Sequence, residues 1–298
     1  MGEEDIAEVA ALLRRVEAET GHPALGEHQW LDLVHGGRAG FAGFVARRPG
    51  RARLLGYAQV SRGIESFAIE VAVEARHKDE GVDVDLLRAA INEVAAQGGG
   101  HVHLWVARPS ERDEQSARAV GLSPGRELYQ LRRALPLEDE LVAEVPKLAL
   151  RPFRVGVDEP AWLELNNRVF GGHPEQGCWD RSTIEQREQQ EWFDPDGFLL
   201  YERHGRLVGF CWTKIAEADD AAGELYVLGV DPDARGSRIG AALLAAGCAH
   251  LSARACRIAM LYVDSDNARA LRLYRSFGFA VDHADRAYVA DVKATVGP

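Results

Sequence analysis

Two residues in the second half of the chain have types and positions that suggest proton transfer. Glu224 opens an apolar segment, and a carboxylate at a strand end can serve as a general base when its surroundings bring its pKa toward working pH. Tyr274 lies in the segment NARALRLYRSFGF, where its hydroxyl could donate a proton to a departing thiolate. The spacing leaves two alternatives open, a solvated glutamate at a strand end and a tyrosine buried in the core.

The segment between these two residues has features of an anion-binding site. The segment GELYVLGVDPDARGSRIGAALLAA predicts a strand, a short loop and a helix of small residues. Backbone N–H groups of such a loop, the helix dipole and the side chains of Arg235 and Arg238 could hold a pyrophosphate. The loop pattern is weak evidence by itself, because Gly–Arg turns are common before helices.

Regular elements must position these residues, and the sequence predicts them in order. We expect helices over AWLELNNRVF and TIEQREQQEWF, then a hairpin that turns at His204-Gly205. The strand ELYVLGV, the helix IGAALLAAGCAHLSARA and the strand IAMLYVD follow. Asn267 is placed to cap the helix ARALRLYRSF, Gly278 to end it, and FAVDHADRAYVADV to form a last strand. This order predicts a mixed α/β fold.

The chain also repeats itself. RLLGYAQV resembles RLVGFCWT, EVAVEARHKDEGVDVDLLRAA resembles ELYVLGVDPDARGSRIGAALL, and HVHLWV resembles IAMLYV. The matches occur in the same order at nearly constant spacing, which predicts two copies of one domain. We expect the copies to occupy residues 1–140 and 151–298, joined by an acidic segment near residues 135–152 that contains prolines.

Composition narrows the classes of function. The 298 residues are 46% hydrophobic and 27% charged, as in ordinary globular proteins, and the net charge of −11 argues against nucleic-acid or anionic membrane partners. No leader sequence and no apolar run long enough for a membrane span is visible. The cysteines form no metal-binding spacing, so we expect a cytoplasmic protein without metal and with reduced thiols at Cys178, Cys211, Cys248 and Cys256. We also expect a monomer.

The combination of glutamate strand, loop, helix, strand and a helix with Asn and Tyr resembles the GNAT family of acetyl-CoA-dependent N-acetyltransferases. The family loop, Q/R-x-x-G-x-G/A, is matched from Arg235 to Gly240, and both halves of the chain carry the pattern. A closer resemblance, to the tandem-GNAT family of mycothiol synthases, rests on NNRVFGGHPEQGCW, EWFDPDGF, GFCWTK, GELYVLGVDP, LYVDSDN and LYRSFGF. HPEQG and GELYVLGVDP are the specific motifs among these.

The resemblance implies a reaction and roles for matching residues. The reaction would be acetylation of the cysteinyl amine of Cys-GlcN-inositol by acetyl-CoA, the last step of mycothiol biosynthesis. Glu224 would be the general base, acting through water, Tyr274 would protonate the leaving thiolate, and a backbone N–H near Leu228 would stabilise the oxyanion.

Further binding residues follow from the same resemblance. Acetyl-CoA would be held by Leu228, Gly229, Val230, Arg235, Gly236, Ser237, Arg238, Ile239, Gly240, Ala241, Asn267, Ala268, Arg269, Ala270, Leu271 and Arg272. The acceptor would be contacted by Glu27, Glu175, Lys214, Glu224 and Tyr262. Because Glu27 belongs to the first copy, we expect the acceptor to lie between the domains.

Two departures from the family pattern matter. Arg238 replaces a family glycine, which would strain the backbone if a positive φ were needed there; we expect Arg238 to compensate by contacting phosphate, with Gly236 taking up the tight turn. The first copy reads KDEGVD in the loop, whose carboxylates would repel a pyrophosphate, and has Ala117 at the position of Tyr274. Although Glu70 matches Glu224, we expect the first copy to be a scaffold and one wall of the acceptor pocket.

Two alternatives remain at this point. A GNAT enzyme could acetylate a different amine, such as an aminoglycoside or a protein N-terminus, although the specific motifs count against this. A non-catalytic acyl-CoA-binding protein is the second alternative, suggested by Arg238 and the degraded first loop. The presence of both Glu224 and Tyr274 argues against it.

Overall fold

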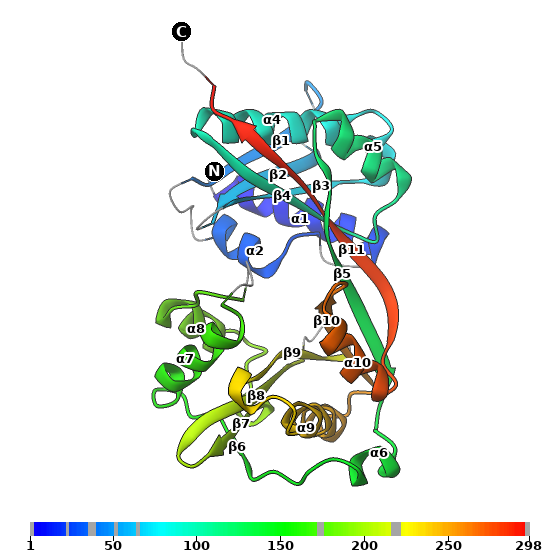
Figure 1. Cartoon of the computed structure of the whole chain (residues 1–298). Coiled ribbons are helices and arrows are strands. Elements are labelled where there is room, and N and C mark those ends of the chain that lie inside the picture. The colour runs from blue at the N-terminus through cyan, green and yellow to red at the C-terminus, as the bar shows by residue number, and fades with distance from the viewer. Residues whose placement is uncertain are drawn as a thin grey trace. The chain divides into compact units, whose positions relative to one another are not determined.

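The computed structural model describes residues 3–21, 24–34, 40–50, 53–63, 66–171, 176–215 and 222–295 and has the mixed α/β class expected from the sequence (Figure 1). The chain divides into two compact units. Unit 1 comprises Met1–Leu128 and Ala284–Pro298, and unit 2 comprises Tyr129–His283. Among the described residues, no helix combines the length and apolar character needed to cross a bilayer.

Unit 1 is a sheet with helices on both faces. Its elements are α1 (Glu3–Thr20), α2 (Glu27–Val34), β1 (Ala42–Arg47), β2 (Leu54–Arg62), β3 (Ser66–Val73), α3 (Ala75–Lys78), α4 (Val82–Ala96), β4 (Gly99–Ala107) and α5 (Glu111–Ala119). Neighbouring residues of β2 point to opposite faces, so Tyr57 packs in one core with α1 while Ala58 packs in another with α4. Strands β1, β2 and β3 are antiparallel neighbours, and β3 pairs with β4 in parallel.

Unit 2 repeats this plan. Its elements are α6 (Asp139–Ala143), β6 (Leu150–Pro152), α7 (Glu159–Val169), α8 (Arg181–Glu188), η1 (Pro195–Gly197), β7 (Phe198–Arg203), β8 (Arg206–Lys214), β9 (Ala222–Val230), η2 (Pro232–Ala234), α9 (Ile239–Ala253), β10 (Ile258–Asp264) and α10 (Ala268–Ser276). Phe210 and Trp212 of β8 face an aromatic core under α7 and α8, while Cys211 between them faces α9. The predicted strands, hairpin and helices are confirmed, except that α8 ends at Glu188, earlier than expected.

The last strand of each copy crosses into the other unit. Strands β5 (Ser123–Ala134) and β11 (Ala280–Lys293) each span a unit boundary. The C-terminal part of β11 pairs antiparallel with β4, from Asp285 opposite Ala107 to Lys293 opposite Gly99, and the red strand lies along β4 in Figure 1. The units therefore differ from the predicted halves at both ends, because strand pairing, which the repeat does not reveal, decides where the last strands belong.

The pairing of β11 with β4 requires a glycine at position 99. Gly99 has a φ of +76°, and a Cβ there would lie 2.4 Å from the carbonyl oxygen of Val292. In unit 2, the end of β5 takes the corresponding role, since Leu131 is fully buried in the core of α9 and the Leu135 N–H donates to the Arg257 carbonyl. Each unit thus needs residues from the other copy to complete its core.

A buried acid follows the central strand of each unit. In unit 1, Glu74 follows β3 and accepts hydrogen bonds from Arg15 (2.6 Å), Arg53 (2.6 Å) and Arg76 (2.8 Å). Burial by itself would raise the pKa of Glu74, but the hydrogen bonds from these arginines outweigh burial and lower the pKa to about 2.

Unit 2 has the same arrangement. Asp231 follows β9, is fully buried, and accepts from Arg168 of α7 and from Arg206 of β8 (2.7 Å). Burial opposes ionisation here too, but the Asp233 N–H and the two arginines lower the pKa of Asp231 below its ordinary value. The repeat thus preserves an ionic cluster that connects a helix (α1 or α7) and the start of a neighbouring strand (β2 or β8) to the end of the central strand.

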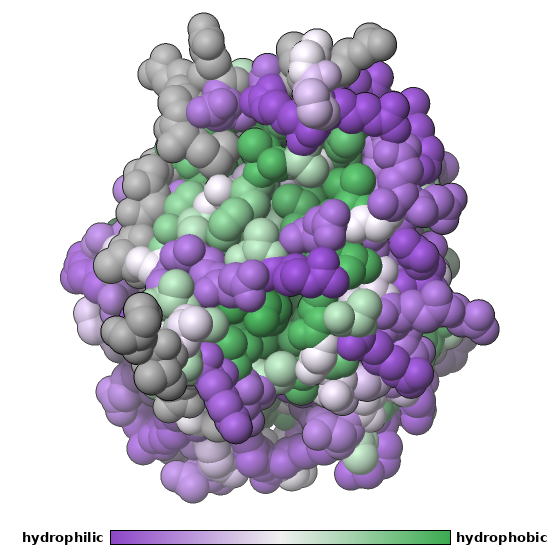
Figure 2. Space-filling model, turned by 90° about the horizontal axis from the view of Figure 1, so that it is seen from above, coloured by the Kyte–Doolittle hydropathy of each residue, from purple (hydrophilic) through white to green (hydrophobic). Residues whose placement is uncertain are grey.

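The surface is not uniformly charged despite the net charge of −11. Seen from above, hydrophobic residues gather in the middle of the face, crossed by a band of hydrophilic residues and bordered by others (Figure 2). Exposed apolar side chains are common on soluble domains, so this face by itself assigns no partner.

Replacing Glu74 with Gln should destabilise unit 1 by roughly 3 kcal/mol at neutral pH, as expected for a pKa displaced from 4.5 to about 2. Because the folded-state pKa is the lower one, the stabilisation is complete above about pH 4.5 and is lost as the pH falls toward 2. Urea denaturation of both proteins between pH 7 and pH 3 measures the difference. The Asp85→Asn control, which breaks an exposed pair with Arg88, should change little; an equal loss in both variants would contradict the prediction.

Candidate active site

A β-bulge interrupts the central strand of unit 2. Strand β8 pairs antiparallel with β9, but the register passes from Trp212 opposite Val227 to Thr213 opposite Leu225, which leaves Tyr226 as an extra residue. A bulge of this kind bends the strand and changes the face to which following side chains point. Leu225 and Leu228 accordingly both face the core of α9, whereas Tyr226 and Val227 face the aromatic core.

The central strand also parts from its parallel neighbour. The register of β9 with β10 contains three pairs and ends at Glu224 opposite Met260, although the strands continue to Val230 and Asp264. Glu224 therefore lies where the two strands separate. Across the other edge of β9, Lys214 is its partner in register. The structure thus brings Glu224 and Lys214 together at one end of the sheet.

The predicted anion-binding loop joins β9 to α9. After Asp231 and the turn η2, Arg235 is extended, Ser237 donates to the Ala234 carbonyl, and α9 begins at Ile239. Gly236 and Arg238 both adopt positive φ, +87° and +59°. The expectation that Gly236 alone would take up the turn is therefore wrong: Arg238 occupies the left-handed N-cap position itself, which costs a non-glycine residue about 1 kcal/mol.

The helix α10 carries the predicted proton donor. Asn267 caps it by accepting from the Ala270 N–H (3.1 Å), as the sequence predicts. Tyr274 packs against the core of α9 and meets Phe279 edge-on at 6.1 Å. Burial raises the pKa of Tyr274 above its ordinary value, and the nearby Cys211 thiol acts in the same direction. The phenol is protonated at neutral pH, as a general acid must be, and the raised pKa extends the protonated range to higher pH.

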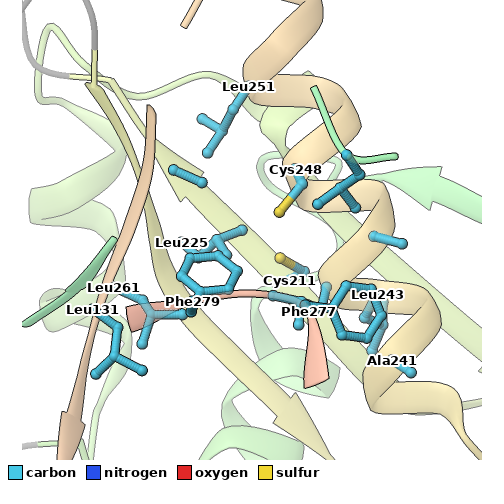
Figure 3. Close-up of a cluster of buried hydrophobic side chains, with 14 of the residues drawn as sticks. Leu131, Cys211, Leu225, Ala241, Leu243, Cys248, Leu251, Leu261, Phe277 and Phe279 are labelled. Carbon is cyan, nitrogen blue, oxygen red and sulfur yellow. The ribbon is translucent and has the colours of Figure 1, made fainter. Parts of the chain in front are cut away.

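The core beneath this region is apolar and closely packed. Figure 3 shows Leu225 and Cys211 on the strands, Leu243, Cys248 and Leu251 on α9, and the rings of Phe277 and Phe279 between them. Cys178, Cys211, Cys248 and Cys256 form no disulfide. Burial raises the pKa of Cys248, to about 12, so this thiol stays neutral.

Aromatic side chains surround Lys214 in an arrangement that the sequence did not predict. The Lys214 Nζ lies 4.4 Å from the ring centroid of Trp192 and 5.2 Å from that of Tyr226. Arg187 of α8 donates from Nε to the Tyr226 hydroxyl at 2.9 Å. The position of Tyr226, two residues after Glu224, was a signal in the sequence, but nothing local marked Arg187 or Trp192.

The other predicted acceptor residues are placed in part. Tyr262 of β10 is 40% exposed and accepts a hydrogen bond from Gln130 Nε2 at 2.6 Å. Glu27 begins α2 of unit 1, but its side chain, like the whole of Glu175, lies outside the described part of the chain. Within the described residues, no group of three or more His, Cys, Asp or Glu side chains could hold a metal ion.

In the matching region of unit 1, side-chain contacts connect the loop to neighbouring helices. Gly81 takes the left-handed position before α4 that Arg238 takes before α9. Lys78 of the loop pairs with Asp113 of α5 at 2.8 Å, and Ser116 of α5 donates to the buried Asp83 of α4. These contacts join the loop and the start of α4 to α5.

The central strands of the two units also differ. In the described residues of unit 1, β2 and β3 pair from Gly56 opposite Val73 to Arg62 opposite Phe67 without a register shift. Unit 1 thus lacks the bulge of unit 2, and Ala117 of α5 is fully buried in the core. The two features that mark the site of unit 2, a bulged strand and a tyrosine on the last helix, are specific to that copy.

The parted strands, the loop before α9 and the repeated element order define the class of protein as a tandem GNAT acetyltransferase. Residues 160–279 match the Acetyltransferase (GNAT) family. A tandem GNAT protein from the clavulanic acid biosynthesis pathway has the same fold with a TM-score of 0.74, 16% identity and coverage of 98% of this chain and 96% of its own. A GCN5-related N-acetyltransferase from Sphaerobacter thermophilus has a TM-score of 0.72, 22% identity and coverage of 100% and 96%.

Sequence relatives narrow the family. The mycothiol acetyltransferase of Acidimicrobium ferrooxidans is 42% identical over 286 residues, which is 93% of this chain and 91% of the relative. Those of Thermobispora bispora and Streptomyces griseus are 41% and 38% identical, with coverage of 91% and 94% of this chain and 91% and 90% of the relatives. The chain belongs to the mycothiol acetyltransferase family.

Replacing Arg238 with Gly should raise the stability of unit 2 by about 1 kcal/mol, because it relieves a left-handed backbone at φ +59°. If Arg238 also contacts phosphate, the same variant should bind acetyl-CoA several-fold more weakly. Thermal denaturation and calorimetry measure the two effects. In the matched control, Gly81→Ala, the added Cβ meets no atom within 4 Å, but φ is +79°, so the stability of unit 1 should fall. A lower stability of the Arg238→Gly protein would contradict the prediction that the Arg238 backbone is strained.

Proposed function

We propose that the chain transfers the acetyl group of acetyl-CoA to the cysteinyl amine of Cys-GlcN-inositol and so forms mycothiol, with the chemistry confined to unit 2. The observation that carries the proposal is the parting of β9 from β10 directly after Glu224, in a chain whose full-length relatives are mycothiol acetyltransferases.

The fit to acetyl-CoA is judged from the backbone. The register of β9 with β10 stops at Glu224, so Leu228, Gly229 and Val230 lie on a strand edge that an extended pantetheine arm could join by amide hydrogen bonds. Arg235 and Arg238 are exposed in the loop, and the first turn of α9 (Ile239, Gly240, Ala241) would present N–H groups to the pyrophosphate. The first turns of α10, from Asn267 to Arg272, would border the other side.

Acetyl-CoA supplies the activated acyl group as a thioester. Glu224 would take a proton from the substrate ammonium through a water molecule, which exposes the nitrogen lone pair. As the C–N bond forms and the C–S bond breaks, the Leu228 N–H would stabilise the charge on the carbonyl oxygen. Tyr274 would give its proton to the departing thiolate and recover one from the acylated nitrogen. The sum is one amide, one thiol and one proton released to solvent.

The described residues that would hold the acceptor are Lys214, Glu224 and Tyr262; Glu27 and Glu175, which the resemblance also implies, lie outside the described side chains. Lys214 and Glu224 are partners in the strand register, and Tyr262 is two residues beyond the partner of Glu224 on β10. This mixture of donors and acceptors suits a cationic amine attached to a hydroxyl-rich sugar. Cysteines that form no disulfide are consistent with a reducing, cytoplasmic location, which we also propose.

Unit 1 would act as a scaffold rather than as a second catalytic unit. Three observations support this: the unshifted register of β2 and β3, Ala117 in place of a tyrosine, and the contact of Lys78 with Asp113. A pyrophosphate would have to displace this ion pair and approach Glu80, whose carboxylate is already bound by Arg48. A single acetyl-CoA site in the chain follows.

The first experiment is to incubate the protein with acetyl-CoA and Cys-GlcN-inositol and to detect the acetylated product by mass spectrometry. Glu224→Gln and Tyr274→Phe should each lower kcat about 100-fold, a usual contribution of general acid–base catalysis. Because the pKa of Tyr274 is raised, the donor is lost only at high pH, so the ratio of parent to Tyr274→Phe activity should be constant from pH 6 to 9.

The matched control is Tyr201→Phe, which removes a hydroxyl from another tyrosine packed against the same core. It should retain the parent activity. Acetyl-CoA binding without acetylation of any amine would favour a non-catalytic acyl-CoA-binding protein, whereas turnover of a different amine alone would favour another acetyltransferase.

Calorimetry should find one acetyl-CoA bound per chain. Arg235→Ala in unit 2 should weaken this binding, because it removes a charge from the loop. Lys78→Ala in unit 1 should leave both the affinity and the stoichiometry unchanged. Two sites of comparable affinity in the parent protein would contradict the proposal that the chain has a single acetyl-CoA site.

A further inference from the structure

Arg187 is a buried cation whose place is set from several sides. Only 2% of the residue is exposed. Its Nε donates to the Tyr226 hydroxyl at 2.9 Å, its Nη1 donates to the Thr183 carbonyl at 2.8 Å, and its guanidinium carbon lies 4.1 Å from the ring centroid of Trp179. A buried guanidinium held by hydrogen bonds and an aromatic face has little freedom to move. The Tyr226 hydroxyl is consequently anchored to α8.

The ring of Tyr226 forms one side of an aromatic corner. It meets Trp212 and Trp192 edge-on, with centroids 5.3 Å away in both cases. Trp212 is fully buried and stacks on Phe198 at 4.3 Å, so the corner is continuous with the rigid core under α7 and α8. Since Tyr226 is the extra residue of the bulge in β9, this corner also fixes the backbone two residues after Glu224.

The ammonium of Lys214 sits in this corner. Its Nζ lies over Trp192 at 4.4 Å and over Tyr226 at 5.2 Å, within the range of a cation–π contact. A lysine has a flexible four-carbon stem, so two aromatic faces convert a mobile charge into a placed one. The placement matters because Lys214 is the register partner of Glu224. At matching positions of the repeat, unit 1 has Ser61 and Gln59 where unit 2 has Lys214 and Trp212.

We propose that Arg187 and Trp192 are positioning residues for acceptor recognition: Arg187 holds Tyr226, and Tyr226 with Trp192 holds the Lys214 ammonium beside the general base. The inference rests on the proposed function of this site and concerns which acceptor amines the site binds. A fixed ammonium donates to the hydroxyl oxygens of an acceptor and repels a second positive charge. The site thus selects amines whose reacting nitrogen is their only cation and whose neighbouring groups are hydroxyl-rich, and it rejects diamines.

The test separates recognition of the acceptor from folding. Trp192→Leu and Tyr226→Phe, the latter losing only the hydroxyl that Arg187 binds, should raise the KM for Cys-GlcN-inositol, by about tenfold for Trp192→Leu, the size expected for loss of a desolvated cation–π contact. The KM for acetyl-CoA should stay within twofold of the parent value. A purely structural role would instead lower the active fraction and leave both KM values unchanged.

A double-mutant cycle tests whether Trp192 affects acceptor binding through Lys214. If Trp192 acts by holding Lys214, then Trp192→Leu should have no further effect on the acceptor KM in a Lys214→Met background. Phe193→Leu is the matched control, because Phe193 belongs to the same aromatic core and packs on Trp212. It should change neither KM. Independent effects of Trp192→Leu and Lys214→Met would overturn the proposal.

NMR spectroscopy can test the contacts of Lys214 independently of the acetylation reaction. Ring currents of two aromatic faces should shift the Lys214 ε-methylene proton resonances upfield, and Trp192→Leu or Arg187→Met should move them toward the random-coil position. If the parent protein acetylates no Cys-GlcN-inositol but the resonances respond in this way, the proposed acceptor is wrong and the positioning network stands. Resonances that do not respond to either variant would overturn the network itself.

Discussion

The end of the central strand in each unit is held by a buried carboxylate bound to arginines, and the geometry of the site depends on this ionic cluster. In unit 2, Asp231 joins Arg168 of α7 and Arg206 of β8 directly before the loop that leads into α9. A buried charge that lost these partners would cost several kcal/mol, so strand, helix and loop must stay in one arrangement. The equivalent cluster around Glu74 shows that this anchor belongs to the scaffold rather than to the chemistry.

The two copies share the scaffold but differ where the chemistry is expected. Unit 2 has a bulge at Tyr226 in its central strand, and unit 1 has an uninterrupted pairing of β2 and β3 in its described residues. The residue of unit 1 that matches the loop arginine, Gly81, avoids the strain that Arg238 carries. The central-strand bulge and the left-handed loop arginine thus both occur in the copy that has a tyrosine on its last helix.

The electrostatics of the candidate site depend on placement more than on the number of charges. Burial raises the pKa of the Tyr274 phenol above its ordinary value, while two aromatic rings hold the ammonium of Lys214, the register partner of Glu224. These effects come from the apolar cores on both faces of one sheet. The surrounding protein therefore raises the pKa of the phenol and restricts the position of the ammonium.

The sequence by itself determined the repeat, the order of elements in unit 2, the Asn267 cap and the family, because periodicity, capping and motif spacing are local properties of the chain. Only the tertiary structure decided three other features. These are the sheet that Asp285–Lys293 completes, the conformation of Arg238, and the contact of Arg187 with Tyr226. Strand pairing, backbone dihedral angles at a loop and packing between distant segments are set by contacts between residues far apart in the sequence, which no local pattern records.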